Sequence, residues 1–159
     1  MKKYIKMLCA SIVVLSLVMG SVGQASAATM KKYTNARFKY SIKYPKYFKV
    51  VNKSQNGDGI TLQGKGVSLA MYGSKPFKKM TGKKYKALYK SYGMKMKKTK
   101  VFKSGFYYEE EHVTDRTIYY ICYSKKRKVE AGFYITCPKK QIKKYRKFAA
   151  KMKKTLKFK

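Results

Sequence analysis

Acidic residues are scarce in this chain of 159 residues, which has 6 Asp and Glu against 40 Lys and Arg and a formal net charge of +34 at pH 7. A charge of this size implies partners of negative charge. It does not imply disorder, because 45% of the residues are hydrophobic and 15% are aromatic, well above the shares typical of charge-driven disordered chains. We therefore expect a folded protein that carries its charge on the outside.

Cysteine and histidine are also rare. Three cysteines are too few for a disulfide-stapled mini-protein, and the single histidine, His112, has adjacent carboxylates but not the ligand spacing of a metal site. Beyond the N-terminus no apolar run reaches the roughly 20 residues needed to span a bilayer. No internal repeat or linker divides the chain, so the sequence predicts one soluble domain with no metal and no cofactor.

The N-terminus has the three parts of a secretory signal. Lysines in the first six residues precede an apolar stretch at 7–23, and Ala25-Ser26-Ala27 supplies the small residues that signal peptidase requires. We expect residues 1–27 to be cleaved after Ala27 and the protein to be secreted, either extracellular or associated with the cell wall. An uncleaved anchor helix is the alternative, which the serines and glycines of the apolar stretch disfavour.

The mature chain is expected to have a flexible leader at 28–35 and a single domain at 36–159. Alternating side chains predict a half-buried strand at 38–44 that Pro45 stops. The turn sequence Asn56-Gly57-Asp58-Gly59 then precedes a hairpin with strands at 60–63 and 67–72. Aromatic and β-branched residues predict a later meander of four strands, at 95–103, 106–113, 117–123 and 128–137.

Two helices complete the predicted domain. Thr81 caps the first, which Gly93 ends, and its apolar side carries Tyr85, Leu88, Tyr89 and Tyr92. Pro138 opens the second, whose apolar stripe comprises Ile142, Tyr145, Ala149, Met152 and Leu156. The order strands, helix, strands, helix predicts an α+β domain with an antiparallel sheet of about six to seven strands flanked by helices.

Lysines without acidic neighbours cover the exposed sides of both helices. From Ala131 to the C-terminus there are ten Lys, one Arg and no acid, so no carboxylate relieves their repulsion. We predict that these lysines bind a polyanion: Lys140, Lys143, Lys144, Lys147, Lys151 and Lys154 of the second helix, with Lys83, Lys86 and Lys90 of the first. A solvated surface is the alternative, although mixed charge serves solubility equally well.

Several polyanions satisfy this charge: teichoic acid, acidic polysaccharide, phospholipid headgroups and extracellular nucleic acid. Lys outnumbers Arg 36 to 4, which favours diffuse attraction over bidentate recognition of one chemical group. The leading hypothesis is therefore a non-enzymatic monomer that binds an anionic envelope or extracellular polymer electrostatically. The second hypothesis is a docking or assembly module of the cell envelope, whose charge steers it toward an envelope protein partner.

A secreted ribonuclease is the third and weakest hypothesis. His112 and Glu110 lie on one strand face and would supply base and acid, with Arg116 as the phosphate clamp. The acidic cluster at 109–111 and Asp115 is explained more simply by salt bridges to neighbouring lysine-rich strands.

Cys122 and Cys137 are the cysteines of the mature chain, and export permits a disulfide. If the turn between their strands centres near 126–127, the residue opposite Cys122 is about Ala131, so the two thiols are not cross-strand partners. The sequence leaves both a disulfide and two free thiols open.

Four segments of the chain form a pattern: residues 38–45 (FKYSIKYP), the turn at 56–60 (NGDGI), the strand at 67–73 (VSLAMYG) and a strand that runs into a Pro-led helix closing on 155–158 (TLKF). In these segments the chain resembles small exported bacterial proteins with a PsbP-like fold. It covers most of residues 36–159. The resemblance implies an antiparallel sheet in an α/β/α sandwich and a docking or assembly role, and it transfers no functional residues.

Overall fold

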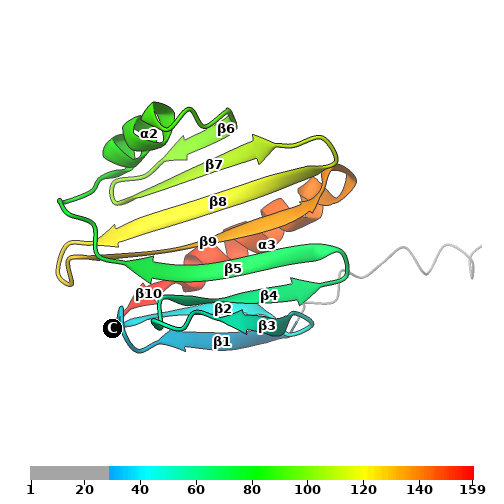
Figure 1. Cartoon of the computed structure of the whole chain (residues 1–159), viewed down its shortest axis with the longest axis horizontal. Helices are drawn as coiled ribbons and strands as arrows, with labels where there is room; N and C mark the ends of the chain where they lie inside the picture. Colours follow the sequence, from blue (N-terminus) through cyan, green and yellow to red (C-terminus); the bar gives the residue numbers. More distant parts are fainter. Residues whose placement is uncertain (1–28) are drawn as a thin grey trace, which may run out of the picture.

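Two β-sheets and two helices make up residues 29–159, the part of the chain that this computed structural model describes (Figure 1). The strands are β1 (Met30–Asn35), β2 (Tyr40–Pro45), β3 (Lys49–Lys53), β4 (Gly59–Gly64), β5 (Val67–Ser74), β6 (Met96–Val101), β7 (Gly105–Glu111), β8 (Asp115–Ser124), β9 (Val129–Pro138) and β10 (Lys157–Phe158). The helices are α2 (Gly82–Ser91) and α3 (Ile142–Thr155), and the 3-10 turn η2 (Lys139–Gln141) leads into α3. The predicted signal, residues 1–27, lies outside the described residues.

The large sheet has seven antiparallel strands in the order β3-β4-β5-β9-β8-β7-β6. Strands β6 to β9 are the predicted meander, and β4 and β5 are the predicted hairpin. Gly64 pairs with Val67, and Gly66 takes the positive φ of 65° that this tight turn requires. The predicted α+β fold class is confirmed.

A small sheet of β1, β2 and β10 lies beside the large one. The expectation of a flexible leader at 28–35 is wrong here, because Met30–Asn35 forms β1 and pairs antiparallel with β2. The Asn35 side chain holds this strand in place. Its amide nitrogen donates to the carbonyl oxygen of Gly57 at 2.9 Å, and its oxygen accepts from the Phe38 backbone N–H at 2.8 Å.

Alternating side chains divide the large sheet into two faces. On β9, Phe133 and Ile135 point to one face and are buried, whereas Tyr134 between them lies half-buried on the other. Helix α3 and the small sheet cover the first face, which we call the α3 face. Helix α2 covers only part of the second, the open face, over β6 and β7. Figure 1 shows α3 running behind the sheet and α2 at its upper edge.

Helix α2 begins where the sequence predicts, whereas α3 begins later than predicted. Pro138, the predicted start of the second helix, is the last residue of β9, and the turn η2 separates it from α3. Tyr92, predicted on the apolar side of α2, is instead exposed beyond the end of that helix. Thr81 is the N-cap of α2 and accepts a hydrogen bond from the Lys84 backbone N–H at 3.3 Å. Gly82 allows α2 to approach the sheet, because a Cβ there would lie 2.1 Å from the carbonyl oxygen of Phe102. On α3 the buried side chains are those of the predicted apolar stripe, Ile142, Tyr145, Ala149 and Met152, with Leu156 half-buried just beyond the helix.

Candidate polyanion-binding surface

Every lysine of the predicted binding set is exposed. The α3 ladder consists of Lys140, Lys143, Lys144, Lys147, Lys151 and Lys154, and the α2 ladder of Lys83, Lys86 and Lys90. Because α2 and α3 pack on opposite faces of the large sheet, the two ladders form separate surfaces. The structure does not bring the whole predicted set together, and the α3 ladder is the larger of the two surfaces.

Glu109 lies beneath α3, and its side chain is 0% exposed. It accepts hydrogen bonds from Arg146 Nε at 2.8 Å and Arg146 Nη2 at 2.7 Å, with Arg116 Nη1 at 3.6 Å and the Tyr107 hydroxyl as further partners. Burial alone raises the pKa of Glu109, but the hydrogen bonds from Arg146 and Tyr107 outweigh it and hold the pKa below its ordinary value. The carboxylate is therefore charged and fully neutralised.

Glu111 is the second acid on the α3 face, and it is also paired. Lys139 Nζ lies 3.1 Å from its carboxylate, Arg116 Nη2 lies 2.8 Å away and Lys97 Nζ lies 3.7 Å away. The hydrogen bond from Lys139 is the main reason that the pKa of Glu111 is lowered. Salt bridges at the acidic cluster are thus confirmed for Glu109 and Glu111, with arginines as the nearest partners.

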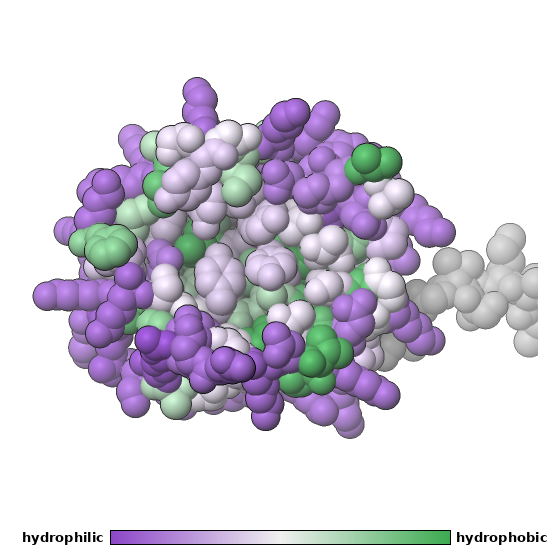
Figure 2. All heavy atoms as spheres, viewed as in Figure 1, coloured by the Kyte–Doolittle hydropathy of each residue, from purple (hydrophilic) through white to green (hydrophobic). Residues whose placement is uncertain are grey.

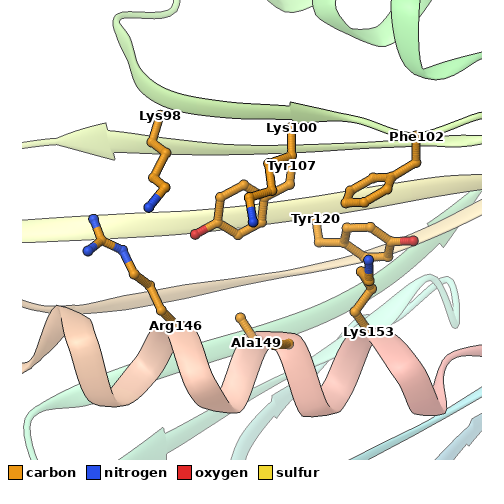
Figure 3. Close-up of a pocket in the computed structure, with 9 residues that line it drawn as sticks. Lys98, Lys100, Phe102, Tyr107, Tyr120, Arg146, Ala149 and Lys153 are labelled. Carbon is orange, nitrogen blue, oxygen red and sulfur yellow. The ribbon is translucent and has the colours of Figure 1, made fainter.

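A pocket of about 180 Å³ lies between β6 and α3. We call it the β6–α3 pocket, and its lining residues are Lys98, Lys100, Phe102, Tyr107, Tyr120, Arg146, Ala149, Ala150 and Lys153. Figure 3 shows Lys98 and Arg146 pointing toward one another from opposite walls and Lys153 pointing toward the rings of Phe102 and Tyr120. The Lys153 ammonium lies 3.8 Å from the centre of the Phe102 ring, a cation–π contact. Lysine and arginine side chains thus form the walls of the pocket, and aromatic rings form its base, which we call the aromatic floor.

A larger pocket of about 700 Å³ flanks the other side of α3. Its lining includes Tyr47, Lys49, Lys65, Lys144 and Tyr145. On a helix with about 100° per residue, Lys144 and Arg146 point to opposite sides, so the exposed crest of α3 separates the two pockets. The α3 ladder and both pockets therefore form one continuous basic surface, which we call the α3 surface.

Comparison with solved structures identifies the architecture. The described fold is similar to that of cyanobacterial PsbP (CyanoP) from Synechocystis sp., with a TM-score of 0.62 and 11% identity over 88% of this chain and 98% of that one. The chain has a PsbP-like fold. The Ran-binding protein Mog1p of Saccharomyces cerevisiae is similar as well, with a TM-score of 0.57 and 8% identity over 83% and 96% of the two chains. A structure from Bacteroides thetaiotaomicron matches with a TM-score of 0.52 and 11% identity over 81% of this chain and 48% of that chain.

These similarities confirm the predicted PsbP-like resemblance at the level of the fold. No protein-family model matches the sequence, and no match is found among curated proteins. At identities of 8% and 11% the similarity carries no information about the site, so function has to be argued from the side chains.

The PsbP-like fold does not assemble the residues of the ribonuclease hypothesis. Arg116 lies on the α3 face with Glu109 and Glu111, whereas Glu110 points to the open face near the Tyr119 hydroxyl, 3.4 Å away. His112 is exposed, and its Nε2 lies 3.3 Å from Thr117 Oγ1. The sheet separates the acid from the phosphate clamp, so this arrangement cannot perform the chemistry.

Both cysteines of the described residues are free and buried. Cys122 lies opposite Ala131, as predicted, and Cys137 lies opposite Arg116. Burial raises the pKa of Cys122 to about 12 and that of Cys137 to about 11. Both are therefore protonated at neutral pH and are poor nucleophiles.

Residues 29–159 contain neither a metal-binding cluster nor a membrane-spanning helix. Within residues 29–159 no group of three His, Cys, Asp or Glu side chains is placed to hold a metal ion. No helix in this described part has the length and hydropathy of a membrane span.

The open face of the PsbP-like fold carries a row of tyrosines across neighbouring strands. The row consists of Tyr72 on β5, Tyr134 on β9, Tyr119 on β8 and Tyr108 on β7. The distances between successive ring centroids, in this order, are 6.3, 5.7 and 4.4 Å. Figure 2 looks onto this face and shows a centre of near-neutral hydropathy ringed by hydrophilic side chains. Most tyrosines serve as core or rim, as the sequence predicts.

The β6–α3 pocket is the part of the surface that the sequence did not predict. Lys98 and Lys100 alternate on β6, and Arg146 and Lys153 are seven positions apart on α3 and so share one side. These spacings are visible in the sequence. What the sequence lacks is a signal that β6, the last strand of the sheet, lies alongside α3.

Proposed function

We propose that this chain is a secreted, non-enzymatic protein that binds an anionic envelope or extracellular polymer through its α3 surface. The observation that carries the proposal is that no lysine of the α3 ladder forms an ion pair with any residue of 29–159. The two acids on this face, Glu109 and Glu111, are already neutralised by Arg116, Arg146 and other cations. The positive field of the ladder is left uncompensated.

The shape of the ladder favours a polymer over a single small anion. Helix α3 has 14 residues, and at about 1.5 Å per residue it extends about 21 Å, with lysines along its whole exposed side. Lysine ammonium groups are strongly hydrated point charges on flexible stems, which suit repeated contacts with a chain of phosphates or carboxylates. Secretion, as the sequence of residues 1–27 predicts, would bring the protein into contact with such polymers.

A charge-matched pair of variants tests the proposal. One variant replaces the α3 ladder with glutamine. The control replaces the same number of exposed lysines away from α3: Lys53, Lys75, Lys78, Lys79, Lys125 and Lys126. Affinity for poly(glycerol phosphate) is measured at several salt concentrations. The affinity of the unmodified protein should fall steeply as salt is added. In a plot of the logarithm of the binding constant against the logarithm of the salt concentration, each phosphate contact contributes about 0.7 to 0.9 to the negative slope.

The α3 variant should lose most of that slope and of the affinity, whereas the control should keep most of both. Equal losses in the two variants would show that the charge acts diffusely and that the α3 surface is not a site. An affinity that does not change with salt would remove the electrostatic proposal altogether.

Protein docking remains a second candidate, favoured by the open face. Tyr134 lies half-buried there, beside the rings of Tyr72 and Tyr119 and outside the cluster that packs with α2. The similar protein Mog1p is described as Ran-binding. A complex with an envelope protein that survives high salt would support docking, because the salt would abolish binding that depends on the lysines.

A further inference from the structure

A polymer that carries only charged groups has nothing to pack against the aromatic rings at the base of the β6–α3 pocket. Phe102 and Tyr107 are half-buried, and their rings line a pocket enclosed by Lys98, Lys100 and Lys153. Polymers of glycerol phosphate, acidic polysaccharides and phospholipid headgroups have no aromatic ring to place on such a floor. A polymer with a planar ring beside each phosphate uses both the floor and the walls.

From this arrangement we infer that the polyanion is a single-stranded nucleic acid, and that the β6–α3 pocket receives one of its bases. The inference rests on the proposed function and names the polymer class. Proteins that bind single strands without sequence preference combine a basic groove for the backbone with aromatic side chains for the bases. In a duplex the bases are already stacked on one another, so this pocket would not receive them.

The size and polarity of the pocket suit a single base. Its volume is about 180 Å³, and an engineered protein cavity of about 150 Å³ is known to hold benzene. Arg146 forms part of the wall, but both of its hydrogen bonds go to Glu109, at 2.8 and 2.7 Å. It is therefore not available for bidentate recognition of a base edge, and binding should tolerate any sequence.

Binding of a base in the pocket requires the Lys153 side chain to move. In the free protein its ammonium covers the Phe102 ring at 3.8 Å. A base that enters the pocket takes that place, since base stacking on an aromatic ring is stronger than an exposed cation–π contact. The displaced ammonium then meets the adjacent phosphate, alongside the α3 ladder.

Two oligomers of equal charge separate base recognition from charge. The probes are a fluorescent oligothymidylate of about 12 nucleotides and an abasic oligomer with the same number of phosphates. The unmodified protein should bind oligothymidylate about tenfold more tightly than the abasic oligomer. A duplex should gain no such advantage per phosphate.

Two leucine variants locate the effect. Phe102→Leu removes the ring and keeps an apolar side chain, so it should weaken oligothymidylate binding about fivefold and leave abasic binding unchanged. Phe77→Leu, at a fully exposed aromatic residue away from the pocket, is the control and should change neither. Should Phe102→Leu fail to fold, NMR of the unmodified protein replaces it: oligothymidylate should shift the ring signals of Phe102 and Tyr107, and the abasic oligomer should not.

Equal affinity for the two oligomers, or an equal loss for both in Phe102→Leu, would overturn the inference. The proposed function would survive that result, because it depends on the α3 ladder and not on the ring. The proposed function fails separately, if the ladder variant and its charge-matched control bind alike.

Discussion

The two faces of the large sheet differ in the groups that donate hydrogen bonds to their carboxylates. On the α3 face, the Glu109 carboxylate is buried and held by the charged groups of Arg146 and Arg116. On the open face, Glu130 accepts hydrogen bonds from the hydroxyls of Tyr85 and Ser74, both at 2.6 Å. One face uses cations to satisfy its acids, and the other uses neutral donors.

The proposed binding is confined to the α3 face, although lysines surround the molecule. The arginines of the α3 face neutralise its two acids and leave the α3 ladder uncompensated. The centre of the open face holds Thr117 and Tyr119 of β8 opposite Thr136 and Tyr134 of β9. Figure 2 shows hydrophilic side chains around a centre of near-neutral hydropathy. Most other lysines of residues 29–159 also lack an ion pair, so what distinguishes the α3 ladder is its alignment along one side of a helix.

The largest effect that separates the faces should come from two neighbouring residues of β9. Phe133 is fully buried under α3, and its replacement by alanine should cost about 4 kcal/mol of unfolding free energy. Tyr134 is half-buried on the open face, and the same replacement should cost about 1 kcal/mol. Urea unfolding measures both values. Equal costs would mean that the open face is as closely packed as the α3 face.

A smaller effect should appear in acid. Because the pKa of Glu109 is lower in the folded protein than its ordinary value of 4.5, its contacts stabilise the fold above that value, and this contribution is lost as the pH falls through the folded pKa. Glu109→Gln should cost about 2 kcal/mol at neutral pH, the value of hydrogen bonds to a charged group.

The difference between this variant and the unmodified protein should shrink as the pH is lowered below about 4.5. Urea unfolding at a series of pH values measures the difference. If it stayed constant into acid, the ion pairs under α3 would not account for it.

The sequence predicted the fold where the side chains alternate strongly. The meander, the hairpin of β4 and β5, and both helices were predicted from apolar side chains at strand or helix spacing, although β6 itself has no continuous apolar face. Strands β1 and β3 and the two-residue strand β10 were missed. Every residue of β3 is exposed, and in β1 exposed Lys31 and Lys32 interrupt the pattern, so neither edge strand shows the period-two burial that identifies a strand.

The site was predictable only in part. The α3 ladder follows from helical spacing alone, and its exposure was predicted correctly. The β6–α3 pocket depends on contacts between residues far apart in the chain, such as Lys153 over Phe102. Local patterns do not report such contacts, and the arginine pairs that neutralise Glu109 are hidden from the sequence for the same reason.

Lysine footprinting tests most directly whether the α3 surface is the binding site. The protein is acetylated with and without poly(glycerol phosphate), and mass spectrometry gives the modification rate at each lysine. We predict strong protection at Lys147, Lys151 and Lys154 on α3, and little change at Lys78 and Lys125 away from it. Protection spread evenly over all five lysines would contradict a localised site and leave only the net charge.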